Sequence, residues 1–243
     1  MLIKDNAVCI RCVDYSETSQ IVTFFTRDTG KISAIAKGAR RPKSPFDGAI
    51  EILSSGYIVF TSSDEPKLVT LTEFQQDPSP PLTELYSLNC LYYACELVNS
   101  LTDEYDPHPL LFDSLLKFIR KVRESKEKTL MLSILILFQL KLLQQTGLLP
   151  ILTMCGNCKS AARQNWKSAF FSSSANTLLC GDCEAHYPDK IRLSRSALES
   201  LANLKKLDQY PLKTLLELEK LLTVHFTEML HRPPKMAKHI LKL

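Results

Sequence analysis

Glycine is scarce in this chain, with seven residues among 243, which leaves little room for loops that cradle phosphate groups. The sequence holds neither G-x-x-x-x-G-K-S/T nor G-x-G-x-x-G, and this argues against a P-loop and ATP hydrolysis. Also absent are H-E-x-x-H, G-x-S-x-G and the deaminase pairing of H-x-E with P-C-x-x-C. No cluster of acidic residues indicates a Mg²⁺-dependent nuclease. We therefore expect a protein that is not an enzyme.

Long apolar runs are missing as well. The longest, LMLSILILF at residues 130–138, falls well short of the ~18 residues that a membrane span needs. The N-terminal MLIKDNAVCIRC has no apolar segment typical of a signal peptide. We expect a cytoplasmic protein without a membrane segment. In that reducing compartment, eight cysteines favour metal ligands or free thiols over disulfides.

Acidic residues are nearly absent from one stretch of the chain. Residues 27–43 carry six Lys and Arg against Asp28 alone, although the net charge of the whole chain is only +4. Residues 191–243 carry ten basic residues against five acidic ones. Two local basic regions in a nearly balanced chain indicate a polyanionic partner. The alternative is that both regions are ordinary solvated surfaces, and charge alone does not decide between the two interpretations.

The first 76 residues have the pattern of a β domain. Five runs rich in β-branched and aromatic residues are separated by turn residues, and DTG at 28–30 predicts a hairpin. In the second and third runs, apolar residues alternate, so that Ile32, Ala34 and Ala36 share one face. Five short antiparallel strands predict a small barrel such as the OB-fold.

The prolines of DPSPPL, residues 77–82, end the β pattern, and a helical period follows. We expect helices near 85–95, 111–122, 127–146, 194–206 and 211–230, with Gly147 ending the third. Ser194 and Pro211 are start signals for the last two. The fold class is therefore α+β and multidomain. The expected parts are a barrel at 1–78, helical segments at 79–152 and 191–243, and a cysteine module at 153–190.

The cysteine module is the sharpest chemical signal. Two C-x-x-C pairs are separated by 21 residues, just outside the usual spacing of zinc modules. Gly156-Asn157 and Gly181-Asp182 suit the tight turns that each pair needs. Four thiolates leave no open ligand position, so one structural Zn²⁺ is expected and a redox dithiol is the alternative. The predicted ligands are Cys155, Cys158, Cys180 and Cys183.

CIRC at residues 9–12 imitates this motif inside a predicted strand. Residues three apart in a regular strand point to opposite faces. We therefore expect Cys9 and Cys12 to be packing residues on different faces, and Cys90 and Cys95 to be packing residues of a helix. His186 lies three residues past Cys183 and is expected at the surface or beside the metal, with replacement of a cysteine ligand as the alternative.

The basic stretch is predicted to lie at the barrel rim. OB-like barrels commonly bind single strands with a cationic groove and stacking aromatics. The nearest aromatic candidates are Phe46 and Tyr57, for which core packing is the alternative. Basic side chains here would contact phosphates without reading sequence. The predicted DNA-contacting residues are Lys37, Arg40, Arg41 and Lys43 in the loop and Arg27 and Lys31 at the hairpin.

The stretch YSETSQIVTFFTRDTGKISAIAKGARRPKS resembles the opening signature of the RecO family of bacterial recombination mediators. The order of barrel, helical domain and inserted four-cysteine module is also similar, as is LLxxxGLLPxLxxCxxC at residues 142–158. The signature residues are Tyr15, Glu17, Ile21–Phe25, Thr26, Arg27, Gly30, Lys31, Lys37, Gly38, Ala39, Arg40, Arg41 and Ser44.

The resemblance implies a non-enzymatic DNA repair protein that binds single- and double-stranded DNA and anneals complementary strands. It also implies three protein partners: RecR, the C-terminal tail of the single-strand-binding protein and, indirectly, the recombinase RecA. The family's DNA contacts match Lys37, Arg40 and Arg41, and match Arg27 and Lys31 less directly. An RNA-binding or transcription-associated zinc-ribbon protein is the competing interpretation.

Two further basic segments are candidates for partner or DNA contacts. Lys117, Arg120 and Lys121 are spaced to share one helix face, which suits the acidic tail of the single-strand-binding protein, with an ordinary solvated face as the alternative. HRPPKMAKHILKL at the end of the sequence carries no acidic residue and is either a DNA contact or a frayed end.

Overall fold

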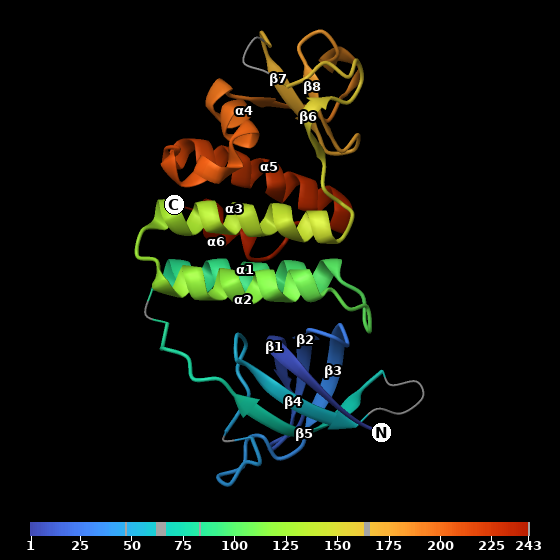
Figure 1. Cartoon of the computed structure of the whole chain (residues 1–243), viewed down its shortest axis with the longest axis vertical. Helices are drawn as coiled ribbons and strands as arrows, with labels where there is room; N and C mark the ends of the chain where they lie inside the picture. The colour runs from blue at the N-terminus through green and yellow to red at the C-terminus, as the bar shows by residue number, and fades with distance from the viewer. Residues whose placement is uncertain (47, 62–66, 83, 163–165, 243) are drawn as a thin grey trace. The chain divides into compact units, whose positions relative to one another are not determined.

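The structure is a computed structural model that describes the chain except residues 47, 62–66, 83, 163–165 and 243. It divides into two compact units, Met1–Arg123 and Glu124–Leu243 (Figure 1). Within the described residues, no helix is both long enough and apolar enough to cross a membrane. The four-part division expected from the sequence stays a prediction.

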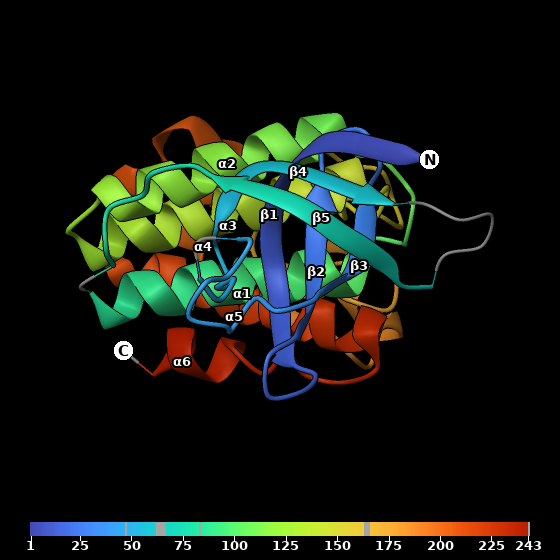
Figure 2. The same ribbon diagram turned by 90° about the horizontal axis from the view of Figure 1, so that it is seen from below.

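The first unit begins with a closed five-stranded barrel in the order β1-β2-β3-β5-β4, in which β4 pairs back to β1. All neighbouring pairs are antiparallel except β3 and β5. Seen from below, β4 and β5 run across the other three strands (Figure 2). The predicted barrel is therefore confirmed. Its strands are β1 (Leu2–Asp14), β2 (Gln20–Thr26), β3 (Lys31–Ala36), β4 (Ser55–Thr61) and β5 (Val69–Gln76).

Alternation of apolar residues decides which face of each strand is buried. On β3, Ile32, Ala34 and Ala36 are fully buried in the barrel core, while the two residues between them are half-buried. On β2, Phe24 faces the core, and Phe25 on the opposite face has its ring 6.2 Å from that of Phe112 on the helix α2 (Pro109–Glu124). The barrel is thus apolar on both sides of β2, because a helix covers the outer side.

The turn between β2 and β3 is the hairpin that DTG predicts. The amide of Thr26 donates to the carbonyl of Gly30 at 2.9 Å, and Gly30 has a φ of +86°. A Cβ at Gly30 would lie 2.5 Å from the carbonyl oxygen of Asp106. Only glycine fits here, because both the backbone conformation and the close approach exclude a side chain.

The prediction for Cys9 and Cys12 is wrong about their faces. Both residues pack against the barrel core. The reason is an irregularity of the β1–β2 register between Cys9 and Arg11. One extra residue in a strand shifts the alternation, so residues three apart come to lie on the same side. Their role as packing residues agrees with the prediction.

Two helices complete the first unit, α1 (Leu85–Leu101) and α2 (Pro109–Glu124). Leu85, which the helical period places with the apolar residues, is 72% exposed at the start of α1. The buried side of α1 instead runs through Tyr86, Cys90 and Leu97. On α2, Leu111, Leu115 and Phe118 are buried among other apolar residues, as their spacing predicts.

The second unit combines helices with a small sheet in the order β6-β8-β7-β9. The hairpin of β7 and β8 is antiparallel, and β6 runs parallel to β8. This sheet carries the cysteines. The elements are α3 (Lys128–Gln145), β6 (Ile151–Cys155), β7 (Ala169–Ser172), β8 (Thr177–Cys180), the 3-10 helix η1 (Glu184–His186), β9 (Ile191–Leu193), α4 (Arg195–Ala202), the 3-10 helix η2 (Leu204–Gln209), α5 (Leu212–Leu230) and α6 (Ala237–Leu241).

The single helix expected over 194–206 is interrupted. Ser194 caps α4 by accepting a hydrogen bond from the amide of Ala197 at 3.1 Å, as predicted, but α4 ends at Ala202. Asn203 leaves the helical region with φ −133° and ψ 51°, and the 3-10 helix η2 follows. Asparagine competes with the helix by local hydrogen bonding, and apolar periodicity does not register such a break.

The core of the second unit contains a buried polar pair. Glu219 on α5 and Gln139 on α3 are both fully buried, and Nε2 of Gln139 donates to Oε1 of Glu219 at 3.1 Å. Oε2 of Glu219 and Oε1 of Gln139 have no partner among the described residues. Burial raises the pKa of Glu219 to about 8, so its carboxyl group stays protonated at neutral pH. The carboxyl proton is then a hydrogen-bond donor for a site whose described residues otherwise leave two oxygen atoms unpartnered.

We predict that Glu219 makes the stability of the second unit depend on pH. Its folded pKa of about 8 lies above the ordinary 4.5, so the folded protein holds a proton that the unfolded chain releases in that range. The free energy of unfolding therefore falls as pH rises from 4.5 to 8. Glu219→Gln, a neutral mimic, is expected to be more stable than wild type at about pH 8 by roughly 2–5 kcal/mol, and close to it at about pH 5.

Urea denaturation of both proteins at several pH values measures this difference. Glu228→Gln, an exposed position on the same helix, is the control and should show no such trend. A constant difference between Glu219→Gln and wild type across the range would contradict the prediction.

Candidate functional site

The basic loop between β3 and β4 is fastened to the barrel core. Ala39, Phe46 and Ile50 of this loop are at most 5% exposed and belong to the core cluster of the barrel. The buried side chain of Gln20 on β2 fixes the loop further: its Oε1 accepts from the amide of Ile50 at 2.9 Å, and its Nε2 donates to the carbonyl of Ile50 at 3.4 Å. The loop therefore presents its polar side chains from a fixed backbone.

The predicted loop cations are all exposed. Lys37, Arg40, Arg41 and Lys43 project from this backbone. Arg40 lies beside Asp14, with 2.8 Å between Nη1 and Oδ2, but both side chains are largely solvated. An exposed pair of this kind contributes ~0–1 kcal/mol, so a phosphate can replace the carboxylate at little cost. Gly38 turns the chain here with a φ of +75°.

The hairpin cations are engaged within the first unit. Arg27 forms a forked contact with Asp113 on α2, with Nε and Nη2 each 3.3 Å from a carboxylate oxygen. Nζ of Lys31 donates to the carbonyl of Asn99 at 2.7 Å and to that of Thr102, both near the end of α1. Burial lowers the pKa of Lys31. Lys31 therefore holds the barrel to the carboxyl end of α1, where a cation is favoured.

The two aromatic candidates differ in their surroundings. Phe46 is 5% exposed and packs in the barrel core, so it is unavailable for stacking on bases. Tyr57 on β4 is half-buried. Phe24, Phe25 and Phe60 are completely buried, so they are packing residues. Pro42 and Pro45, just before Phe46, indicate a loop, but not whether the aromatic ring folds back into the core.

Sequence reasoning missed the residues that position this surface. Gln20 fixes the loop, and Asp5 fixes the hairpin. Asp5 is 4% exposed and its carboxylate accepts from the amide of Thr29 at 2.8 Å and from its hydroxyl at 2.7 Å. The only signal in the sequence is a polar residue at an inward position of an otherwise apolar strand.

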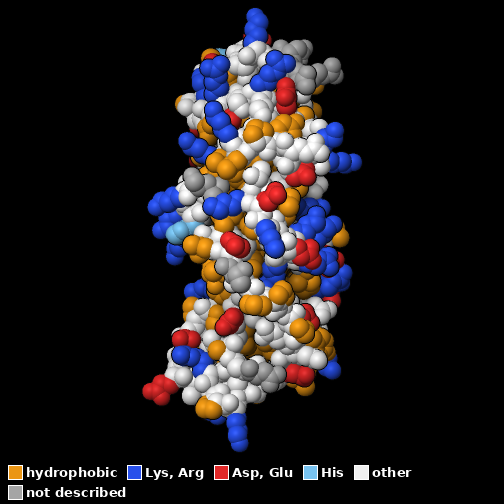
Figure 3. All heavy atoms as spheres, turned by 90° about the vertical axis from the view of Figure 1, so that its left-hand side faces the viewer, with side chains coloured by type: hydrophobic (Ala, Val, Ile, Leu, Met, Phe, Trp, Pro, Cys, Tyr) orange, Lys and Arg blue, Asp and Glu red, His pale blue; other side chains and the backbone are white. Residues whose placement is uncertain are grey.

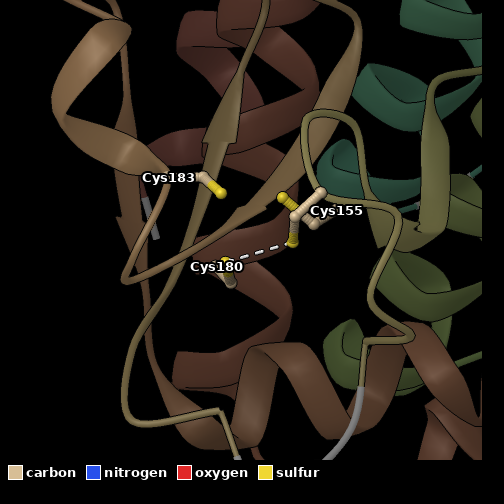
Figure 4. Close-up of side chains that lie close together, drawn as sticks. Cys155, Cys180 and Cys183 are labelled. Carbon is tan, nitrogen blue, oxygen red and sulfur yellow. Dashed lines mark hydrogen bonds between the residues drawn. The ribbon is translucent and has the colours of Figure 1, made fainter.

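The four predicted metal ligands come together in the second unit. Their sulfur atoms all lie within 4.8 Å of one another, and those of Cys158 and Cys180 are 3.7 Å apart. Figure 4 shows the side chains of Cys155, Cys180 and Cys183 converging on one point from different segments. Sulfurs bound tetrahedrally to one Zn²⁺ at ~2.3 Å lie about 3.8 Å apart, so this arrangement fits a metal ion.

Each pair of cysteines sits on a tight turn beside the β7–β8 hairpin. The amide of Cys155 donates to the carbonyl of Ser160 at 2.8 Å, and the amide of Cys183 to that of Cys180 at 3.1 Å. Close approach requires a glycine at the first turn, where Thr177 is branched at Cβ, whereas at the second turn the hydroxyl of Ser168 can rotate away. A Cβ at Gly156 would lie 2.3 Å from Cγ2 of Thr177, and one at Gly181 would lie 2.3 Å from Oγ of Ser168.

Two of the four thiols have shifted pKa values. Hydrogen bonds with Ser160 lower the pKa of Cys158 to about 6, whereas burial raises the pKa of Cys180 to about 12. A thiol such as Cys180 becomes a thiolate at neutral pH only beside a positive charge, and a bound metal supplies one. His186 is exposed and does not belong to the cluster.

The remaining basic candidates lie on helices. Lys117, Arg120 and Lys121 are all exposed on α2, so they share the accessible side of that helix. On the face drawn in Figure 3, Lys and Arg side chains stand beside Asp and Glu rather than forming a continuous basic field. In the C-terminal segment, Ala237 and Ile240 of α6 are buried, so this part of the chain is packed rather than frayed.

Comparison with known proteins assigns both halves of the chain. The family model described as "Recombination protein O N terminal" matches residues 1–76, and "Recombination protein O C terminal" matches residues 82–238. This chain belongs to the RecO family. The two models meet near DPSPPL, where the β pattern gives way to the helical one.

Curated relatives agree with this assignment. "DNA repair protein RecO" of Rhodopirellula baltica is 32% identical over 213 residues, which cover 86% of this chain and 77% of that protein. The protein of the same name from Alkaliphilus metalliredigens is 33% identical over 75% of this chain and 72% of its own length. That of Bacillus pumilus is 30% identical over 83% and 76%. Membership of a family of non-enzymatic recombination mediators bears out the expectation that the chain is not an enzyme.

We predict about one metal ion per chain, held by the four cysteines. Metal analysis of the purified protein gives the stoichiometry. Cys180→Ser is expected to lose most of the metal, because three thiolates and a hydroxyl bind Zn²⁺ far more weakly. Cys12→Ser, outside the cluster, is the matched control and should keep its metal. Full metal content in Cys180→Ser would show that the cluster is not the site.

We also predict that Lys31 acts on stability. Lys31→Ala removes two charged hydrogen bonds to the end of α1, so the free energy of unfolding should fall by about 1–3 kcal/mol. The salt dependence of oligonucleotide binding should stay that of wild type. Lys4→Ala, an exposed position on β1, is the control for loss of one charge. A Lys31→Ala protein of normal stability but weakened binding would assign Lys31 to the DNA contact instead.

Proposed function

We propose that this protein is a mediator of DNA repair and homologous recombination that binds single- and double-stranded DNA through its barrel. The anchored basic loop carries the proposal. Lys37, Arg40, Arg41 and Lys43 are exposed on a backbone held by Gln20 and by apolar anchors in the core. Phosphate contacts by such side chains supply affinity without sequence preference.

Annealing of complementary strands follows from the same contacts. Two strands repel each other through their phosphates, and a basic surface that neutralises part of this charge lets them approach. The step needs no ATP, which agrees with the absence of a P-loop. We further propose that the protein helps load the recombinase RecA onto single strands coated by the single-strand-binding protein, at the bacterial nucleoid in the cytoplasm.

Zinc is the metal that we propose for the cysteine cluster. Soft thiolate ligands in a closed tetrahedral set favour Zn²⁺, which has no redox chemistry of its own. Cys155 and Cys158 would hold it from the first turn, and Cys180 and Cys183 from the second. The ion would fix these turns to each other, so its role is structural.

Partner binding is proposed for the helices. The exposed Lys117, Arg120 and Lys121 on α2 offer positive charge to the acidic C-terminal tail of the single-strand-binding protein. RecR is the second proposed partner, engaged as RecA is loaded. We also propose that the chain divides into parts at 1–78, 79–152, 153–190 and 191–243, a division that limited proteolysis would test.

The proposed DNA contact makes a prediction for Arg40→Ala/Arg41→Ala. We expect slower annealing of complementary oligonucleotides and weaker binding of a single strand. The log–log slope of affinity against salt should fall by about 1.4, because each lost phosphate contact removes ~0.7. Fluorescence anisotropy across a salt series measures the slope, and a strand-annealing assay measures the rate.

Lys205→Ala/Lys206→Ala, which removes two exposed charges from η2, is the control of equal charge. If it weakens binding as much as the arginine variant, net charge rather than the loop is responsible. Unchanged binding by Arg40→Ala/Arg41→Ala would contradict the proposed contact. Competition by single-stranded RNA that equals competition by DNA would favour the alternative of an RNA-binding protein.

A further inference from the structure

A second basic cleft lies in the Glu124–Leu243 unit, beside the cysteine module. It has a volume of about 640 Å³ and is bordered by β7, β9 and the start of α4. Its lining includes Trp166, Lys167, Arg192 and Arg195, and no Asp or Glu occurs among the described residues that line it. A cleft with three cations and no carboxylate is complementary to an anion.

The cations of this cleft are available. Lys167 and Arg192 are exposed, and the side chain of neither forms a hydrogen bond or ion pair with any residue that the structure describes. The side chain of Arg195 is 73% exposed and meets only Glu199, with 3.1 Å between Nε and Oε1. Surface pairs one helical turn apart contribute only ~0.3–0.5 kcal/mol, so this contact is easily exchanged for a phosphate.

The carboxylates near the cleft are bonded to other groups, and one of them holds Ser194 of the cleft lining. Glu184 pairs with Lys190. Asp189 accepts hydrogen bonds from the hydroxyl of Ser172 and the amide of Ser174, both at 2.9 Å. Glu217 accepts from the amide of Ser194. These acidic groups are thus engaged, while Lys167, Arg192 and Arg195 are exposed.

Trp166 gives the cleft an aromatic surface. It is the one tryptophan of the chain. Its half-buried ring packs against the cluster that contains Cys155, Leu179 and Cys180, and it also lines the cleft. The cysteine module therefore holds the ring in place from one side. An immobilised aromatic beside free cations is the combination with which proteins bind single strands, because every base has a stacking face.

We propose that this cleft is a second contact for single-stranded DNA, with a base stacked on Trp166 and phosphates held by Lys167, Arg192 and Arg195. The choice of DNA as the polyanion rests on the proposed function. The site itself does not, because it lies in the other unit and shares no residue with the loop of the barrel. Its chemistry also distinguishes it from that loop, where the candidate aromatic Phe46 is buried.

Tryptophan fluorescence reports directly on this site, because the chain has a single tryptophan. The probe is a deoxythymidine oligonucleotide, titrated into the full chain under excitation selective for tryptophan. We expect quenching with the same midpoint as the anisotropy of a labelled strand. Lys167→Gln/Arg192→Gln should lower the log–log salt slope by about 1.4, or ~0.7 for each contact. Trp166→Ala should weaken binding about five-fold or more, and Trp166→Phe much less.

Three controls make the result decisive. Lys205→Gln/Lys206→Gln removes the same charge elsewhere in the unit and should leave quenching and slope unchanged. Metal analysis of the Trp166 variants excludes loss of the cysteine module as the cause of weaker binding. Arg40→Ala/Arg41→Ala separates the two sites: it should retain quenching at higher DNA concentration.

Two outcomes would overturn the proposal. A strand that binds by anisotropy without changing Trp166 emission shows that the cleft is not occupied, and the proposed function survives that result. If Lys167→Gln/Arg192→Gln binds with the salt slope and the affinity of wild type, the cleft is likewise not a contact for the strand. A wild-type chain that binds no oligonucleotide at all contradicts both this proposal and the proposed function.

Discussion

The buried amide of Gln20 is the contact on which the barrel surface depends. It satisfies both the donor and the acceptor of one loop residue, Ile50, inside the apolar core. Loss of such a pair leaves polar groups unsatisfied in a dry environment, which costs about 1–3 kcal/mol for each group. Since Phe46 and Ala39 bury their side chains in the same core, the loop that carries four cations is continuous with the barrel. A binding surface on a fixed backbone loses little conformational entropy when a ligand arrives.

The cysteine module reaches a similar rigidity by another route. Its sheet consists of strands of three to five residues, too short to enclose a core of their own. Four sulfurs and the packing of Trp166, Phe170 and Tyr187 around them replace that core. A metal bound there couples coordination to folding, because the site forms only when both turns are in place. The two units thus stabilise their surfaces differently, one by apolar anchors and one by ligands.

Local patterns predicted what local forces determine. Alternation along 31–36 and the DTG turn identified a strand and its hairpin, and two C-x-x-C pairs identified the sulfur cluster. Features that need contacts distant in the sequence were missed. Lys31 looks like a surface cation until α1 brings the carbonyl of Asn99 to it. The burial of Phe46 depends on the barrel closing, and the common face of Cys9 and Cys12 depends on one irregular register. Neither of these last two features produces a periodic pattern in the sequence.

The engagement of Lys31 with the end of α1 has a consequence for kinetics. A half-buried cation held by two carbonyl oxygens has few counterions to release when a nucleic acid arrives. Under the proposed function, the barrel would hold a strand mainly through the exposed cations of its loop, so the residence time there would be short. Rapid exchange would suit the proposed mediator, because a partner with a more extensive interface could displace it without any expenditure of chemical energy.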